Sequence, residues 1–215
     1  MMRRGGCLSI IAVVCTIIAT SANANLIANG DFATCDFTGW STFLTANGDL
    51  GPPPRPDVSS FDVTGTGASC AGEFQVGQVT FNSGVPAGGG IQQDFVTPFG
   101  SFNFHMDFAA FNPAATENAS GGDFSVFIDG VTEANASTGD ILPGQTIRGS
   151  FDFVVDLAAI NHPLQVQITR LFQNTATTPL EYVDNISLTP VATIPEPAPW
   201  SLLAFAVSGF ALARR

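Results

Sequence analysis

Alternating apolar and polar residues constrain the fold of this 215-residue chain more than any other feature. Over residues 102–108 every second residue is apolar, and the same period of two recurs over 124–129 and 164–169. Successive side chains of a β-strand point to opposite faces, so the pattern is typical of strands with one buried and one exposed face. The chain is therefore expected to form antiparallel sheets with a phenylalanine-rich inner face.

Less regular stretches of the same kind fill most of the sequence from residue 25 to residue 194. The further strands predicted are 42–45, 58–64, 73–81, 91–97, 147–155 and 181–188. Turn sequences such as Asn47-Gly48 and Asp129-Gly130 separate them. No helical pattern of convincing length lies between them. About eight or nine antiparallel strands predict an all-β, two-sheet sandwich of jelly-roll type, with an open barrel as the alternative.

The first 24 residues have the composition of a secretory signal peptide. Two arginines precede an apolar run over 7–20, and Ala22 and Ala24 place small residues at the two positions that a signal peptidase reads. We predict a signal helix that is removed after Ala24, with an uncleaved anchor helix as the alternative. The mature protein would begin at Asn25.

The other end of the chain carries a second apolar run, residues 198–213. It lies between two polar groups: Pro195, Glu196 and Pro197 before it, and Arg214 and Arg215 after it. Prolines disfavour both strands and helices, so the folded domain is expected to end before them. A helix of this run would be about 24 Å long, marginal for a hydrocarbon core of about 30 Å. The arginine pair predicts a transmembrane helix with a cytoplasmic C-terminus, and a buried helix of a soluble domain is the alternative.

This order of proline motif, apolar run and basic tail resembles the PEP-CTERM sorting signal of Gram-negative bacteria. The resemblance implies that an exosortase recognises the tail at residues 195–215. It also implies a protein that is exported, anchored transiently in the inner membrane, and then moved to the cell surface or released. Residues 1–24 would be the signal peptide and 25–194 the β-sandwich domain. In that family the tail directs the protein to its location and says little about the activity of the attached domain.

The predicted domain is strongly acidic. Residues 25–194 hold three arginines, no lysine and 17 carboxylates, so the net charge is 3 − 17 = −14, against −11 for the whole chain. Such a surface repels nucleic acid and anionic lipid, and it attracts divalent cations. We therefore expect no nucleic-acid partner.

Cys35 and Cys70 are the cysteines that remain once the signal peptide is removed. An even number of cysteines in an oxidising compartment predicts a disulfide between them. Two free, buried thiols are the alternative.

The two ends of the predicted domain carry a second resemblance. Residues 25–32 and 37–40 look like the opening of jelly-roll carbohydrate-binding modules, and residues 182–188 look like their closing strand. In such modules the first and last strands lie near one another, and their carboxylates often hold a structural calcium ion. The resemblance makes Asp31 and Asp184 candidate calcium ligands, and the alternative is that both carboxylates face water.

Little in the sequence points to catalysis, and we expect no enzyme. His105 and His162 are interpreted as surface residues, and neither has a second histidine at metal-binding spacing. Two functions remain. The sequence favours a structural or adhesive protein of an extracellular matrix or biofilm, and the alternative is a carbohydrate-binding module that holds polysaccharide. Sugars stack on exposed aromatic rings, for which Trp40 and Tyr182 are the candidates, although Trp40 is expected in the core.

Overall fold

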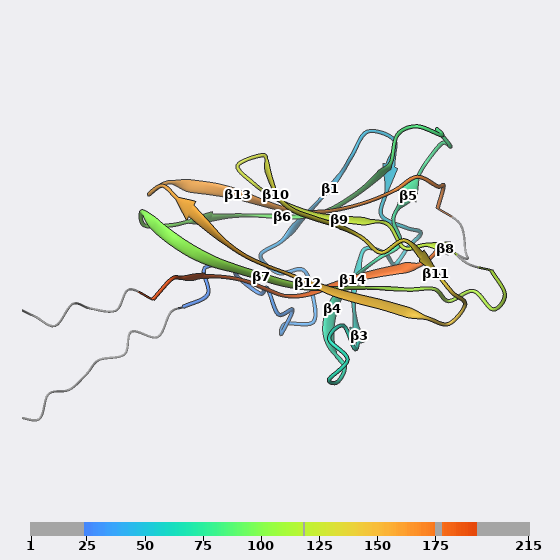
Figure 1. Cartoon of the computed structure of the whole chain (residues 1–215), viewed down its shortest axis with the longest axis horizontal. Coiled ribbons are helices and arrows are strands. Elements are labelled where there is room, and N and C mark those ends of the chain that lie inside the picture. The colour runs from blue at the N-terminus through green and yellow to red at the C-terminus, as the bar shows by residue number, and fades with distance from the viewer. Residues whose placement is uncertain (1–23, 118, 175–177, 193–215) are drawn as a thin grey trace, which may run out of the picture.

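The computed structural model describes residues 24–117, 119–174 and 178–192. They form two five-stranded antiparallel sheets, packed face to face as two layers, and two further two-stranded sheets (Figure 1). The prediction of an all-β antiparallel sandwich is confirmed for these residues, which include no helix. A helix able to cross a membrane is accordingly not found within them. The predicted signal helix and transmembrane helix lie outside the described residues.

Most neighbouring strands within each layer are distant in the sequence, and one pair in each layer is consecutive. The first sheet has the order β1 (Ser41–Leu44), β6 (Ala87–Val96), β13 (Asn161–Arg170), β9 (Asp123–Ile128) and β10 (Val131–Ser137). The second has the order β12 (Thr146–Leu157), β7 (Gly100–Phe111), β14 (Leu180–Pro190), β4 (Ser69–Phe74) and β3 (Asp57–Phe61). The small sheets pair β2 (Gly48–Asp49) with β5 (Gly77–Gln78), and β8 (Ala119–Ser120) with β11 (Asp140–Ile141).

The alternating pattern places the core between the two layers. On β7, Phe104 and Met106 are 1% and 0% exposed, whereas the intervening His105 faces outward. Phe108 of the second sheet stacks on Phe124 of the first with ring centroids 4.6 Å apart. The three most regular predicted segments thus lie in β7, β9 and β13, as expected.

The strand prediction differs from the structure in several places, since the described residues form fourteen strands where eight or nine were expected, and the two-residue strands β2, β8 and β11 are among the additional ones. The predicted strand 73–81 is divided, because β4 ends at Phe74 and only Gly77–Gln78 pairs again, with β2. Strand β10 was not predicted. Its alternation is interrupted by a bulge between Thr132 and Ala134, which shifts the apolar residues out of the period of two.

The N-terminal segment, residues 24–40, runs beside β14 without forming a strand. Leu26 N donates to Leu188 O at 2.9 Å, and Ile186 N donates to Gly30 O at 2.8 Å. A Cβ at Gly30 would lie 1.9 Å from Ile186 O, so only glycine permits this approach. The predicted disulfide is present and joins Cys35 of this segment to Cys70 of β4, with their Cα atoms 5.3 Å apart.

Two buried ionisable side chains lie between the layers, where β13 ends and β14 begins. Arg170 is 6% exposed and Glu181 is fully buried. The Glu181 carboxylate accepts a hydrogen bond from Val76 N at 3.0 Å through Oε2, but its Oε1 and the Nε and Nη1 of Arg170 have no hydrogen-bond partner. Burial raises the pKa of Glu181 to about 8, even though the charge of Arg170 opposes the rise.

Candidate functional site

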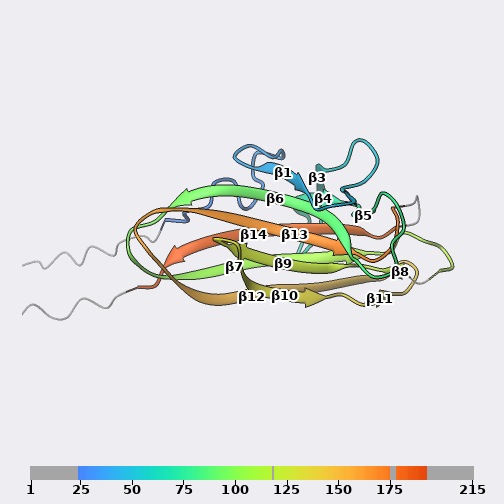
Figure 2. The ribbon, with the colours of Figure 1, turned by 90° about the horizontal axis from the view of Figure 1, so that it is seen from above.

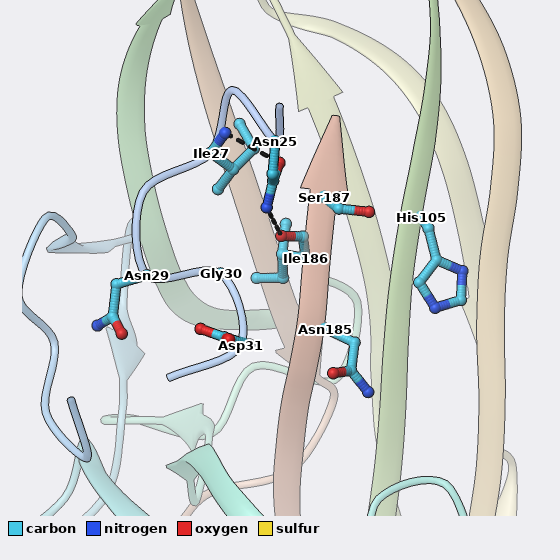
Figure 3. A pocket seen from close by; sticks show the side chains of 9 residues that line it. All are labelled: Asn25, Ile27, Asn29, Gly30, Asp31, His105, Asn185, Ile186 and Ser187. Atoms are coloured by element: carbon cyan, nitrogen blue, oxygen red, sulfur yellow. Dashed lines mark hydrogen bonds between the residues drawn. The ribbon is translucent and has the colours of Figure 1, made fainter. Parts of the chain in front are cut away.

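A polar hollow of 380 Å³ lies where the N-terminal segment meets β14 and β7 (Figure 3). It is lined by Asn25, Ile27, Asn29, Gly30, Asp31, His105, Asn185, Ile186 and Ser187. Figure 3 shows Asp31 on the N-terminal segment to one side of β14 and His105 on β7 to the other. The hollow therefore includes one of the two predicted calcium ligands.

Two asparagines of the hollow, Asn25 and Asn29, bond to backbone groups of other parts of the chain. Asn25 donates to Ile186 O at 3.3 Å and accepts from Leu188 N at 2.9 Å. Asn29 donates to Asp36 O and Thr38 O at 2.9 and 3.0 Å. Because these amides are engaged with backbone groups, they have little capacity left for a ligand.

His105 is held between two carboxylates on the outward face of the second sheet. Its Nδ1 lies 2.7 Å from Asp152 Oδ1 and its Nε2 lies 3.2 Å from Asp107 Oδ2. Partial burial lowers the pKa of His105, but the hydrogen bonds to Asp152 and Asp107 outweigh it, so that the pKa is raised. Ser187 is the residue opposite His105 in the sheet. Since both ring nitrogens are bonded to carboxylates, the ring has no free nitrogen to take a proton from Ser187, and the group is not a nucleophile–base arrangement.

His162 is not the surface residue that was predicted. It is 1% exposed, lies 2.7 Å from Asp129 Oδ2 through Nδ1, and stacks on Phe95. The inward positions of β13 continue from Leu164 back to His162, so the alternation extends further than the proline at position 163 suggests.

Of the two predicted calcium ligands, Asp31 lines the hollow, and Asp184 is buried on β14. Burial is the main cause that raises the pKa of Asp184, and the charges of Asp107 and Asp31 raise it further. Both Asp184 oxygens already accept hydrogen bonds, from Ser69 Oγ and Asn185 N, each at 2.7 Å. In the part of the chain that the structure describes, no three His, Cys, Asp or Glu side chains converge on a metal position. Calcium takes six to eight oxygens, so these two carboxylates alone do not fit it, and the calcium site stays a prediction.

The two aromatic residues predicted for sugar contact both lie in packed positions. Trp40 is 8% exposed, donates from Nε1 to Asn29 O at 3.1 Å and stacks on Phe32. Tyr182 is 4% exposed and stacks on Phe61 with ring centroids 3.7 Å apart. Trp40 is thus in the core, as expected, and neither ring has an exposed face on which a sugar could stack.

The outward face of the first sheet carries an uncharged surface that crosses all five strands. One row of paired residues is Ser41, Gln92, Gln165, Phe127 and Thr132. The adjacent row is Phe43, Gly90, Gln167, Ser125 and Asn135. We call these ten residues the amide band. None of them is charged, although the domain around them has a net charge of 3 − 17 = −14.

The side chains of the amide band are positioned by one another. Gln165 Nε2 donates to Gln92 Oε1 at 2.9 Å, and Asn135 Nδ2 donates to Ser125 Oγ at 2.8 Å. Within the second row, Gly90 and Ser125 are buried, so the exposed part of this row is formed by Phe43, Gln167 and Asn135. At about 4.8 Å between strands, the band is roughly 19 Å wide.

The band combines the two kinds of group that recognise sugars. Phe43 and Phe127 are half-buried and belong to neither hydrophobic cluster of the described residues, so their rings lie outside the core. The amides of Gln92, Gln165 and Gln167 can both donate to and accept from hydroxyl groups. Aromatic surface flanked by a few polar groups is typical of small-molecule sites, and it suits the apolar faces and hydroxyls of a sugar ring.

No protein-family model matches the chain, and no curated protein does. Solved structures are similar to this chain at TM-scores below 0.5. TmCBM61 in complex with β-1,4-galactotriose has a TM-score of 0.46 and 10% identity, over 78% of this chain and 99% of that one. The CBM22-1 xylan-binding domain of Xyn10C from Paenibacillus barcinonensis has a TM-score of 0.42 and 12% identity, over 82% and 100%. Arabinose-bound MgGH51 arabinofuranosidase has a TM-score of 0.47 and 15% identity, over 80% of this chain and 27% of that enzyme.

These structure neighbours are mostly carbohydrate-binding modules, and some are parts of glycoside hydrolases.

Proposed function

We propose that the β-sandwich domain is a carbohydrate-binding module that holds a neutral polysaccharide on the amide band. The observation that supports the proposal most is an uncharged, amide-lined and phenylalanine-flanked surface on an otherwise acidic domain. An anionic polymer would be repelled by the surrounding carboxylates, including Asp94 and Asp123 on β6 and β9. A neutral glycan carries no such penalty, and its hydroxyls match the glutamine amides.

Substitutions in the amide band test this proposal. We expect Phe127→Ala to weaken binding to soluble xylan or β-1,4-galactan by about tenfold, since the loss of one stacking ring costs roughly 1.4 kcal/mol. Gln165→Ala removes both the amide and its bond to Gln92 and should weaken binding by a similar factor. Isothermal titration calorimetry measures the affinities, and thermal melting verifies that each variant is folded.

Phe172→Ala is the matched control, because Phe172 is 48% exposed and lies outside the band. It should bind like the unaltered protein. Equal losses in Phe172→Ala and Phe127→Ala, or no binding of any neutral polysaccharide by the unaltered protein, would contradict the proposal.

The resemblance of residues 195–215 to a sorting signal supports a cellular location for this activity. We propose that the protein is exported, held transiently in the inner membrane by residues 198–213, and processed by an exosortase at Pro195-Glu196-Pro197. At the cell surface, a polysaccharide-binding domain would adhere to an extracellular matrix or biofilm polymer. The structural role favoured by the sequence and the sugar-binding role are then two aspects of one function.

Processing of both ends can be followed by mass spectrometry in the native host. The exported protein should begin at Asn25 and end near Ile194. Glu196→Ala, or deletion of Arg214 and Arg215, should leave an unprocessed form in the inner-membrane fraction, because the recognition motif or the stop for translocation is lost. Surface protein that still contains residues 200–210 would show that the tail is a plain anchor.

A further inference from the structure

One end of the sandwich presents three exposed apolar side chains on adjacent turns. Val96, Phe99 and Ile160 are 68%, 85% and 57% exposed. The turn after β6 and the turn before β13 are joined, because Thr97 Oγ1 donates to Ala158 O at 2.7 Å and Thr97 N donates to Ile160 O at 3.3 Å. We call Val96, Phe99 and Ile160 the apolar tip.

The described chain leaves the domain at this same end. Val191 N donates to Ser101 O at 2.9 Å, which places Val191 beside the second residue after Phe99. Figures 1 and 2 agree that both ends of the described chain lie at the end where β6 turns into β7. The apolar run at 198–213 begins seven residues after Val191, and seven residues span at most about 25 Å. The apolar tip is therefore tethered close to that run.

The chemistry of the tip suits a lipid surface without net charge. The charged residues nearest in the sequence are acidic, Asp94 on β6 and Asp156 on β12, and all three arginines of the domain lie elsewhere in the sequence. Anionic headgroups would be repelled, whereas zwitterionic headgroups and the acyl boundary accept valine, isoleucine and phenylalanine side chains.

We propose that the apolar tip inserts into the interface of a zwitterionic bilayer while residues 198–213 span it. This inference rests on the proposed membrane anchoring of the tail. The tip then acts as a second contact that orients the domain, with the long axis of the sandwich upright on the membrane. The amide band, on the outward face of the first sheet, stays open to polysaccharide in this orientation.

Photo-crosslinking to lipid tests the orientation. The full chain is reconstituted into phosphatidylcholine–phosphatidylethanolamine vesicles with Phe99→p-benzoylphenylalanine, and lipid adducts are counted by mass spectrometry after irradiation. Phe81→p-benzoylphenylalanine is the matched control, because Phe81 is also an exposed phenylalanine, at 53%. It comes three residues after β5, and β5 lies toward the opposite end of the sandwich (Figure 1).

We expect roughly tenfold more lipid adduct from position 99 than from position 81, since burying one phenylalanine side chain shifts an equilibrium by at least about that factor. Vesicle-bound protein with equal adducts at both positions overturns the tip proposal alone. Protein–protein adducts at position 99 in place of lipid adducts overturn it in favour of a second copy. A full chain that does not float with the vesicles overturns the tail anchor, and the tip proposal with it.

Discussion

Glu181→Gln is expected to stabilise the domain at pH 8 and to remove most of the loss of stability that the unaltered protein shows between about pH 5 and pH 8. The pKa of Glu181 is raised from 4.5 to about 8 by burial. Between these values the folded state binds a proton that the unfolded state has released, so stability falls as pH rises. A shift of this size corresponds to a change of about 5 kcal/mol in the free energy of unfolding. Glutamine carries no charge and keeps an oxygen to accept from Val76 N.

Other groups act in the same direction and must be separated from Glu181. The pKa values of His105 and His162 are raised by their carboxylate and carbonyl partners, in spite of opposing burial. Their contribution is complete below the unfolded pKa and is lost as pH rises through the folded pKa. The unaltered domain is therefore expected to be most stable at mildly acidic pH.

Urea unfolding at pH 5, 6, 7 and 8 isolates the effect of Glu181. Glu117→Gln removes the same charge from an exposed position and serves as the control. Stability curves of Glu181→Gln and the unaltered protein that stay parallel from pH 5 to pH 8 would contradict a buried, proton-binding carboxyl.

Removal of the Cys35–Cys70 disulfide is expected to cost about 3 to 4 kcal/mol of unfolding free energy in the loop-entropy model. The bond closes a loop of 36 residues, since 70 − 35 + 1 = 36. It also secures the strand-free segment that carries Phe32 and Trp40 into the core. The double variant Cys35→Ser, Cys70→Ser should therefore unfold at lower guanidinium concentration.

The reduced form of the unaltered protein, compared under the same conditions, is the control for the serine hydroxyls. Both should lose stability to a similar extent. An unchanged midpoint in the double variant would mean that the non-covalent contacts of residues 24–40 hold the segment without the disulfide.

The strands that could be predicted are those whose side chains alternate without interruption. In β7 and β13 the period of two is set by burial of one face, and the sequence displays it directly, whereas in β9 the intervening Ser125 is also buried. The bulge of β10 breaks the period, and the split of the predicted strand 73–81 depends on pairing with β2, thirty residues away in the sequence. A pairing between strands that are distant in the sequence is a tertiary contact, so the local sequence contains no pattern that predicts it.

The amide band shows why the candidate site was harder to predict than the fold. The sequence marks Gln165 and Gln167 as outward residues, but their neighbours come from four other strands and depend on the register. Tyr182 is an aromatic residue of the kind on which sugars stack, yet the face of its ring is covered by Phe61. Residue type alone makes Tyr182 a candidate for sugar contact, but tertiary packing buries the ring and excludes it. The disulfide could be predicted from the number of cysteines and the inferred oxidising compartment alone.

A titration of the ¹⁵N-labelled protein with a neutral xylo- or galacto-oligosaccharide, followed by NMR, tests the carbohydrate-binding account most directly. The side-chain amide signals of Gln92, Gln165 and Gln167, together with backbone signals of β6, β13 and β9, are predicted to shift with a common saturation curve. Shifts confined to the hollow around His105 and Asn185, or no shift with any neutral glycan, would contradict binding on the amide band.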